Sequence, residues 1–205
     1  MNLILAYDTE TTGLPLWKDP SDHPDQPHLV QLAACVVDTD AREIVQSMDV
    51  IIRPEGWEIP DEVAAIHGIN TDLAAAVGVP EKVAVDMFLS LWRGRTRMAH
   101  NEQFDARIMR IASMRHMGEL VADRWKDTGE SICTARLSTP VCALPPTDKM
   151  KAAKRFHHKT PNLTEAYETL TGKTMVNAHT AMADVLACIE VYWAILDATN
   201  APEAA

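Results

Sequence analysis

Residues 3–13, LILAYDTETTG, decide the fold. The first five form a continuous apolar run that stops at a polar turn, which is typical of a central β-strand covered on both faces. Because side chains alternate along a strand, Asp8 and Glu10 point to the same side where the strand leaves the core. Two like charges held together need a cation, and carboxylate oxygens on a rigid strand suit Mg²⁺ or Mn²⁺. The alternative is an acidic pair that merely begins a solvated loop.

The composition indicates one globular domain over residues 1–205, with 47% hydrophobic residues to build a core. There are 29 acidic and 19 basic side chains, so the net charge of −10 gives no global attraction to nucleic acid or to anionic membranes. The apolar start lacks the basic flank of a signal peptide, and no stretch approaches the roughly 18 apolar residues of a membrane span. We therefore expect a cytoplasmic protein.

The order of the expected elements indicates an α/β fold with a mixed sheet. Strands are expected within residues 3–7, 28–40, 42–54 and 96–100, and helices within 59–70, 80–94, 101–118, 161–172 and 181–198. Residues 14–28 contain four prolines and predict a long exposed loop. Residues 138–161 contain four more prolines around a basic segment, and we expect them to be irregular apart from a short helix near Lys151.

Two further acids lie where a helix could hold them rigidly. Asp105 is near the start of a helix that Phe104 and Ile108 would anchor, although a simple interaction with the helix dipole is the alternative. Asp184 lies among small apolar residues of an expected buried helix, where an unpaired charge costs several kcal/mol. A metal ion would remove that cost. His179 precedes this helix and is free to face a cleft, although many such histidines are ordinary surface residues.

Four segments together resemble a known family. They are DTETTGL (residues 8–14), AAIHGIN (64–70), HNEQFD (100–105) and HTAMAD (179–184). Three of them are similar to the motifs of the DEDD 3′–5′ exonucleases. The five-residue step from His179 to Asp184 resembles the histidine subclass (DEDDh, DnaQ-like), whose best-known member is the proofreading subunit of bacterial DNA polymerase III. The resemblance spans about residues 3–193 and implies a ribonuclease H-like fold with a mixed five-stranded sheet.

The resemblance also implies the catalytic groups and the cofactors. The ligands of two divalent ions, Mg²⁺ or Mn²⁺, would be Asp8, Glu10, Asp105 and Asp184, with His179 as general base. Two such ions about 4 Å apart can activate water and neutralise charge on a phosphodiester. The implied partner is a nucleic acid with a free 3′ end, taken here as single-stranded DNA, and the product is a nucleoside 5′-monophosphate.

The substrate contacts follow from the same resemblance. The main chain near Thr11 and Thr12 would contact the 3′ hydroxyl of the terminal nucleotide. The residues that would line or shape its pocket are Leu14, Ile66, His67, Asn101 and Phe104. The alternative role of Asn101 is a helix cap, and that of Phe104 is an aromatic residue of the core. The basic segment KMKAAKRFHHK, residues 149–159, would guide a strand to the site or form an ordinary solvated face; its cations are Lys149, Lys151, Lys154, Arg155 and Lys159.

Two rival functions stay open. A 3′–5′ exoribonuclease of the RNase T or oligoribonuclease type would need a cleft that accepts a 2′ hydroxyl. A non-catalytic module that binds nucleic acid or a polymerase would lack at least one of the five catalytic residues, all of which are present. The sequence stops at Ala205, just after the last expected helix, so we expect no tail that tethers a polymerase and favour a free-standing exonuclease.

Overall fold

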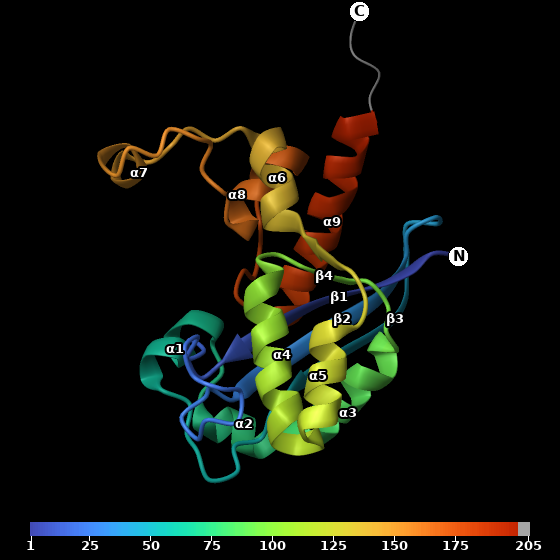
Figure 1. Ribbon diagram of the computed structural model, residues 1–205, viewed down its shortest axis with the longest axis vertical. Coiled ribbons are helices and arrows are strands. Elements are labelled where there is room, and N and C mark those ends of the chain that lie inside the picture. Colours follow the sequence, from blue (N-terminus) through green and yellow to red (C-terminus); the bar gives the residue numbers. More distant parts are fainter. Residues whose placement is uncertain (201–205) are drawn as a thin grey trace, which may run out of the picture.

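The computed structural model describes residues 1–200, and its centre is a five-stranded mixed sheet (Figure 1). The strand order is β3-β2-β1-β4-β5. The strands are β1 (Leu3–Thr11), β2 (Leu29–Asp38), β3 (Glu43–Ile51), β4 (Arg97–Ala99) and β5 (Ser131–Cys133). The first three pair antiparallel, and β4 and β5 extend the sheet in parallel from β1. The predicted α/β fold with a mixed five-stranded sheet is therefore confirmed.

Helices flank both faces of the sheet (Figure 1). Those before β5 are α1 (Asp61–His67), α2 (Thr71–Val77), α3 (Glu81–Trp92), α4 (Glu102–Met117) and α5 (Glu119–Asp127). Those after it are α6 (Thr134–Cys142), α7 (Asp148–Ala152), α8 (Leu163–Thr171) and α9 (Ala181–Asn200). Three of these, α2, α5 and α6, lie outside the helices expected from the sequence pattern.

One apolar core lies between the sheet and α3, α4 and α5. Leu5 and Tyr7 of β1 enter it, together with Phe88 of α3 and Trp125 of α5. The ring of Tyr7 lies 5.3 Å from that of Phe88 and 5.7 Å from that of Trp125, in tilted and edge-on arrangements that aromatic rings favour. This core fixes the position of β1 against α4.

A second core covers the opposite face of the sheet. Ile4 and Ala6 pack there against Val185 of α9. Since alternate residues of a strand face the same side, Asp8 and Glu10 continue the row of Ile4 and Ala6 toward α9. The packing of Ile4 and Ala6 against α9 therefore places Asp8 and Glu10 on the face of the sheet that α9 covers.

The loop formed by residues 14–28 contains no helix or strand, as its prolines predicted, but it is exposed only in part, whereas an exposed loop was predicted. The side chain of Gln26 is only 2% exposed and exchanges hydrogen bonds with the main chain of Leu16, at 3.0 and 3.1 Å. Arg107 of α4 donates to the hydroxyl of Ser21 at 2.7 Å. A buried amide and an arginine of α4 thus supply the partners that this chain segment cannot find in a regular ladder.

Residues 138–161 are partly helical. The short helix expected near Lys151 is α7, but the first residues of the segment are not irregular, because α6 continues through Pro140 to Cys142. Proline lacks the N–H that a helix interior requires, and α6 ends soon after it, with Ala143 in the left-handed region at φ 47°. The expectation about a tail concerns residues 201–205, which lie outside the described residues. Within residues 1–200, none of the helices combines the length and apolarity needed for a membrane span.

Candidate active site

Three carboxylates converge where β1 meets α9. Asp8 and Glu10 lie inside β1, and Asp184 lies in the first turn of α9. One oxygen of each lies within 4.8 Å of the other two. The alternative in which Asp8 and Glu10 begin a solvated loop is wrong, because strand pairing places them opposite Ala33 and Gln31 of β2.

Asp105 approaches β1 from the other side of the sheet. Its Oδ1 accepts hydrogen bonds from the main-chain N–H of Thr9 at 3.0 Å and from the Thr9 hydroxyl at 2.8 Å. β4 pairs with β1 only at Leu5 and Ala6, so the carboxylate satisfies a strand N–H that β4 does not reach. Asp105 is buried in the first turn of α4, but it is also anchored to β1 and therefore does more than interact with the helix dipole.

The crowding and burial of these acids raise their pKa values. Burial raises the pKa of Asp8 well above its usual range, and the charges of Asp105, Asp184 and Glu10 raise it further. Burial and the charges of Asp184 and Asp105 raise the pKa of Glu10 to about 8. Burial raises the pKa of Asp105 to about 7, although the bonds from Thr9 oppose the shift.

This donor set fits divalent metal ions. Within the described residues, neither Asp8 nor Glu10 accepts a side-chain hydrogen bond, and no lysine or arginine pairs with any of the four acids. Carboxylates that repel each other without a counter-charge gain most from a hard cation with oxygen ligands, such as Mg²⁺ or Mn²⁺. Asp8, Glu10, Asp105 and Asp184 could therefore hold such ions.

His179 lies on the exposed segment that leads into α9. Its main-chain N–H donates to Oδ1 of Asp184 at 3.3 Å, and its backbone lies in the left-handed region at φ 68°. This conformation is uncommon for residues other than glycine. The bond ties the loop that carries the imidazole to an acid of the cluster. His179 is exposed to solvent, and its facing a cleft stays a prediction.

The predicted contacts that follow β1 lie at the edge of the cluster. Thr11 is buried at the end of β1 and donates its hydroxyl to the carbonyl of Gly13 at 2.8 Å. Thr12 exchanges two hydrogen bonds with the main chain of His28, each 3.0 Å long. Leu14 is 78% exposed, so its side chain is accessible, and its contact with a base stays a prediction.

The other predicted contacts come from α1 and from the start of α4. Ile66 is 57% exposed at the end of α1. His67 beside it is buried; its Nδ1 accepts the N–H of Ile69 at 3.2 Å, and its Nε2 has no partner among the described residues. Asn101 precedes α4 at φ 69° without capping it, so the predicted cap role is wrong, whereas Phe104 does pack against the core.

The basic segment, residues 149–159, does not contact the acidic cluster within the described residues. In Figure 1, α7 lies at the end of an arm that projects from the body of the molecule, away from β1. Lys151 pairs with Asp148 at 3.2 Å, and Lys159 pairs with Glu165 of α8. The side chains of Lys149, Lys154 and Arg155 are exposed. Guidance of a strand by these residues stays a prediction.

Two supporting residues were missed from the sequence. Thr9 holds Asp105, as described above. Gln31 lies in β2 opposite Glu10; its Oε1 accepts the N–H of Ala181, the first residue of α9, at 3.1 Å, and its Nε2 donates to Asp49 at 2.8 Å. A single amide inside the otherwise apolar stretch LVQLAACVV was the available signal, because a buried polar group needs partners.

Comparisons with known proteins agree with this arrangement. A family model described as "Exonuclease" matches residues 5–192. No curated protein sequence matches the chain significantly.

Several solved structures share the fold. Exonuclease I of E. coli in complex with a dT13 oligonucleotide has a TM-score of 0.71 and 23% identity, with 97% of this chain and 41% of that chain covered. The same enzyme with a dA16 oligonucleotide gives a TM-score of 0.69 and 19% identity, over 96% of this chain and 41% of that chain. Exonuclease I of Methylocaldum szegediense has a TM-score of 0.70 and 20% identity, with 99% of this chain and 42% of that chain covered.

This chain thus spans about two-fifths of the length of these neighbours, the shares being 41% and 42%. At such identities the likeness shows the fold alone. The family assignment rests on the family model and agrees with the four motifs read from the sequence. Because that match runs from residue 5 to residue 192, nearly the whole chain, the chain belongs to the exonuclease family.

Proposed function

We propose that the chain is a metal-dependent 3′–5′ exonuclease that removes nucleoside 5′-monophosphates one at a time from the 3′ end of single-stranded DNA. The observation that carries the proposal is the convergence of Asp8, Glu10 and Asp184, with Asp105 anchored beside them. Membership of the exonuclease family supports it.

The four acids would hold two divalent ions, Mg²⁺ or Mn²⁺. When bound, such ions activate a water molecule and neutralise the charge that develops on the phosphodiester. The charges of both Asp105, on α4, and Asp184, on α9, raise the pKa of the Asp8 carboxyl group, so Asp8 lies close to the acids of both helices. It is therefore the residue proposed to contact both ions.

His179 is proposed as the general base. Histidine is the side chain most often used to take up a proton near neutral pH. The bond from its main chain to Asp184 keeps the imidazole on the same loop as the cluster, and its exposure leaves the ring free to reach a water molecule above the acids.

Restriction to a 3′ end would come from the residues around the cluster. We propose that the main chain of Thr11 and Thr12 contacts the terminal 3′ hydroxyl. Leu14 and Ile66 offer exposed apolar surface on which a base can stack, and His67, buried beside Ile66, would support that surface from below. Asn101 and Phe104 would shape the floor of the same pocket.

Single-stranded DNA is the substrate we favour, because E. coli exonuclease I, which shares the fold, was solved with dT13 and dA16 oligonucleotides. RNA is the second candidate. No polymerase partner is proposed, and a cytoplasmic location stays a prediction.

The test is digestion of matched 5′-labelled single-stranded DNA and RNA in Mg²⁺, with wild type and His179→Ala. The proposal predicts a ladder that shortens from the 3′ end, faster on DNA, and slowed about 10²-fold or more in His179→Ala, the usual range for loss of a general base. Faster digestion of RNA would transfer the proposal to an exoribonuclease. Digestion from the 5′ end or internal cleavage would overturn it.

A further inference from the structure

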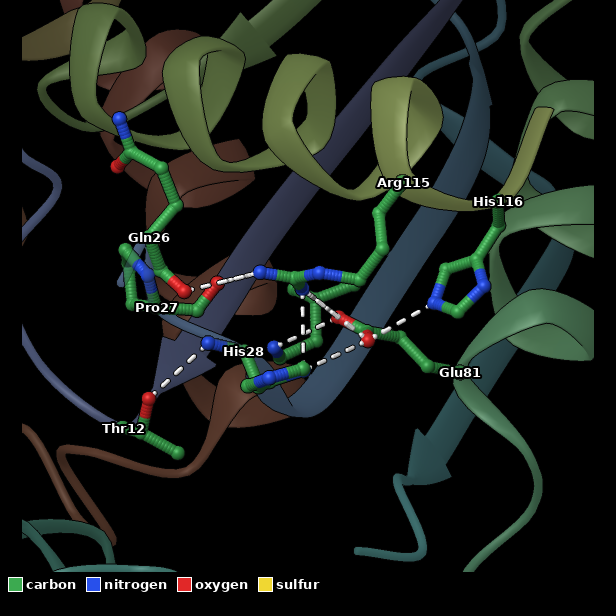
Figure 2. Close-up of polar contacts among 8 residues, drawn as sticks. Thr12, Gln26, Pro27, His28, Glu81, Arg115 and His116 are labelled. Atoms are coloured by element: carbon green, nitrogen blue, oxygen red, sulfur yellow. Dashed lines mark hydrogen bonds and ion pairs between the residues drawn. The ribbon is translucent and has the colours of Figure 1, made fainter. Parts of the chain in front are cut away.

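A cluster of polar side chains around a buried carboxylate lies beside the loop that follows β1 (Figure 2). We call it the Glu81 cluster; its members are Glu81, Arg115, His28 and His116. Glu81 is the first residue of α3 and is 4% exposed. Arg115 and His116 lie in the last turn of α4. The cluster therefore joins the start of one helix to the end of another, where the helix dipoles favour a negative and a positive charge respectively.

The carboxylate of Glu81 is the centre of this cluster. Nη1 of Arg115 donates to both of its oxygens at 3.2 Å, and Nε2 of His116 lies 2.9 Å from Oε2. Burial alone would raise the pKa of Glu81, but its hydrogen bonds with His116 and His28 and the charge of Arg115 keep that pKa well below its usual range. A buried ion pair with this many partners is a rigid attachment point, because breaking it would leave a charge uncompensated.

The Glu81 cluster holds residues 26–29, where the proline-rich loop (residues 14–28) leads into β2. Nη2 of Arg115 donates to the carbonyls of Gln26 and Pro27 at 2.9 and 3.1 Å. The carboxylate of Glu81 accepts the N–H of Leu29 at 3.0 Å. Figure 2 shows Arg115 beside Gln26 and Pro27, with the bonds to their carbonyls as dashed lines.

His28 completes the attachment of this segment. Its ring lies 3.0 Å from Glu81 and stacks on Trp57, with the ring centroids 4.5 Å apart and the planes 10° from parallel. Residues 26–29 are thus held at four consecutive positions.

Thr12 depends on this segment for its own position. Its N–H donates to the carbonyl of His28 at 3.0 Å. Its hydroxyl accepts the N–H of His28 at 3.0 Å (Figure 2). The register between β1 and β2 shifts between Glu10 and Thr11, so Thr12 lies beyond the regular ladder. Its place relative to Asp8 and Glu10 is fixed by His28 instead.

We propose that the Glu81–Arg115 ion pair positions Thr12, through residues 26–29, for contact with the 3′ hydroxyl of the terminal nucleotide. The inference rests on the proposed function, because Thr12 must be a substrate contact for its position to matter. Glu81 and Arg115 are positioning residues that do not touch the substrate. Arginine is required because one planar guanidinium must serve a carboxylate and two carbonyls at once, which a lysine ammonium cannot do in the same geometry.

The experiment compares Arg115→Lys with the matched control Arg110→Lys. Arg110 lies on the same helix and pairs with Asp123 of α5 at 3.0 Å, with no hydrogen bond to residues 12–28 within the described chain. KM and kcat are measured on single-stranded DNA ending in a 3′ hydroxyl and on the same strand ending in a 3′-deoxy nucleotide. Hydrogen exchange of the Thr12 amide is followed in the same proteins.

Wild type and Arg110→Lys should prefer the 3′ hydroxyl strand, and Arg115→Lys should lose about three- to tenfold of that preference, the effect of one hydrogen bond. The Thr12 amide should exchange faster in Arg115→Lys only. A purely structural role would lower the amount of folded enzyme and leave the preference unchanged. If Arg115→Lys does not fold, Glu81→Gln, which keeps the shape and removes the charge, should reduce the preference in the same direction.

The outcomes separate the two claims. A wild type that digests DNA from the 3′ end without preferring the hydroxyl would overturn the contact at Thr12 and this inference with it. A wild type that shows the preference, together with an Arg115→Lys enzyme that keeps it, would overturn the inference alone. Loss of the preference without faster exchange at Thr12 would also overturn it, because Arg115 would then act by another route.

Discussion

Thr9 donates its main-chain N–H and its hydroxyl to the same oxygen of Asp105, at 3.0 and 2.8 Å. Thr9 belongs to β1, which carries Asp8 and Glu10, whereas Asp105 belongs to α4. These two bonds cross from a strand to a helix and fix the fourth acid relative to the first two. They also occupy Oδ1, so Oδ2 of Asp105 would be the oxygen available to a bound metal ion.

Replacing Thr9 with valine removes the hydroxyl and preserves the shape of the side chain. We expect Thr9→Val to lower kcat by about tenfold and to weaken Mg²⁺ activation, because Asp105 would keep only one of its two anchors. Titration of the initial rate with Mg²⁺ measures both effects. Thr139→Val is the control: its hydroxyl donates to Ala135 at 2.8 Å within α6. Equal rates for wild type and Thr9→Val would show that Asp105 needs no support from β1.

Gln31 connects β2 to the first N–H of α9, the helix that carries Asp184. Gln31→Met keeps the size of the side chain but leaves the N–H of Ala181 without its acceptor, so we expect a loss of about 1 to 3 kcal/mol in the free energy of unfolding. Urea denaturation measures it.

Gln31→Glu separates the helix attachment from the side chain's other bond. It restores the acceptor but places a carboxylate next to Asp49, so its stability should rise when Asp49→Asn is added. If Asp49→Asn has the same effect in Gln31→Glu as in wild type, the contact between the two side chains does not matter.

The raised pKa of Glu10 predicts how stability depends on pH and metal. In the metal-free protein the pKa of Glu10 is about 8, above its ordinary value of 4.5. Between these values the folded state binds more protons than the unfolded state, so the free energy of unfolding falls as pH rises. A divalent ion competes with those protons, and the gain in Tm on adding Mg²⁺ should therefore be larger at pH 8 than at pH 6. Glu10→Gln should reduce this difference, and an equal gain at both pH values would contradict the assignment.

The projecting arm offers a test of strand guidance. Reversing the charges of Lys151, Lys154 and Arg155 to glutamate should raise KM for single-stranded DNA and flatten its dependence on salt, with kcat unchanged, because exposed cations act through the phosphates. Steady-state rates at several salt concentrations measure this. Lys126→Glu, on α5 and paired with Asp127 at 3.7 Å, is a control for a change of charge alone. An unchanged KM would show that the arm is an ordinary solvated surface.

The local sequence pattern predicted the central strand, the two strands that follow it and the same-side orientation of Asp8 and Glu10, because side chains alternate along a strand. It also predicted that Asp184 needs a partner, because an unpaired buried charge is costly. That these acids meet in one site was implied by the resemblance to the DEDD exonucleases. The helix boundaries set by glycine also agree with the structure: Gly68 ends α1 in the left-handed conformation at φ 77°.

The parts that failed depend on distant contacts. Only Gly118 separates α5 from α4. α5 joins the core because its Trp125 packs against Tyr7 of β1 and Phe88 of α3, residues that are distant in the sequence. The roles of Thr9 and Gln31 likewise require the register of β1 against its neighbours, which no local pattern specifies.

The proline-rich loop shows the same limit at one residue. Gln26 in that loop is buried because its amide pairs with Leu16, ten residues earlier. The prolines correctly predicted the absence of regular structure, but composition does not predict the hydrogen bonds that bury Gln26.

The most direct test of the account is digestion of a 5′-labelled single strand by wild type and by Asp8→Asn, with and without Mg²⁺, and with Asp123→Asn as the control for an acid outside the cluster. Asp8→Asn keeps the size of the side chain and removes a charge that lies among Asp105, Asp184 and Glu10. We predict metal-dependent shortening from the 3′ end by wild type and Asp123→Asn, and none by a folded Asp8→Asn protein. Shortening that persists in Asp8→Asn, or that does not need a divalent ion, would contradict the central claim.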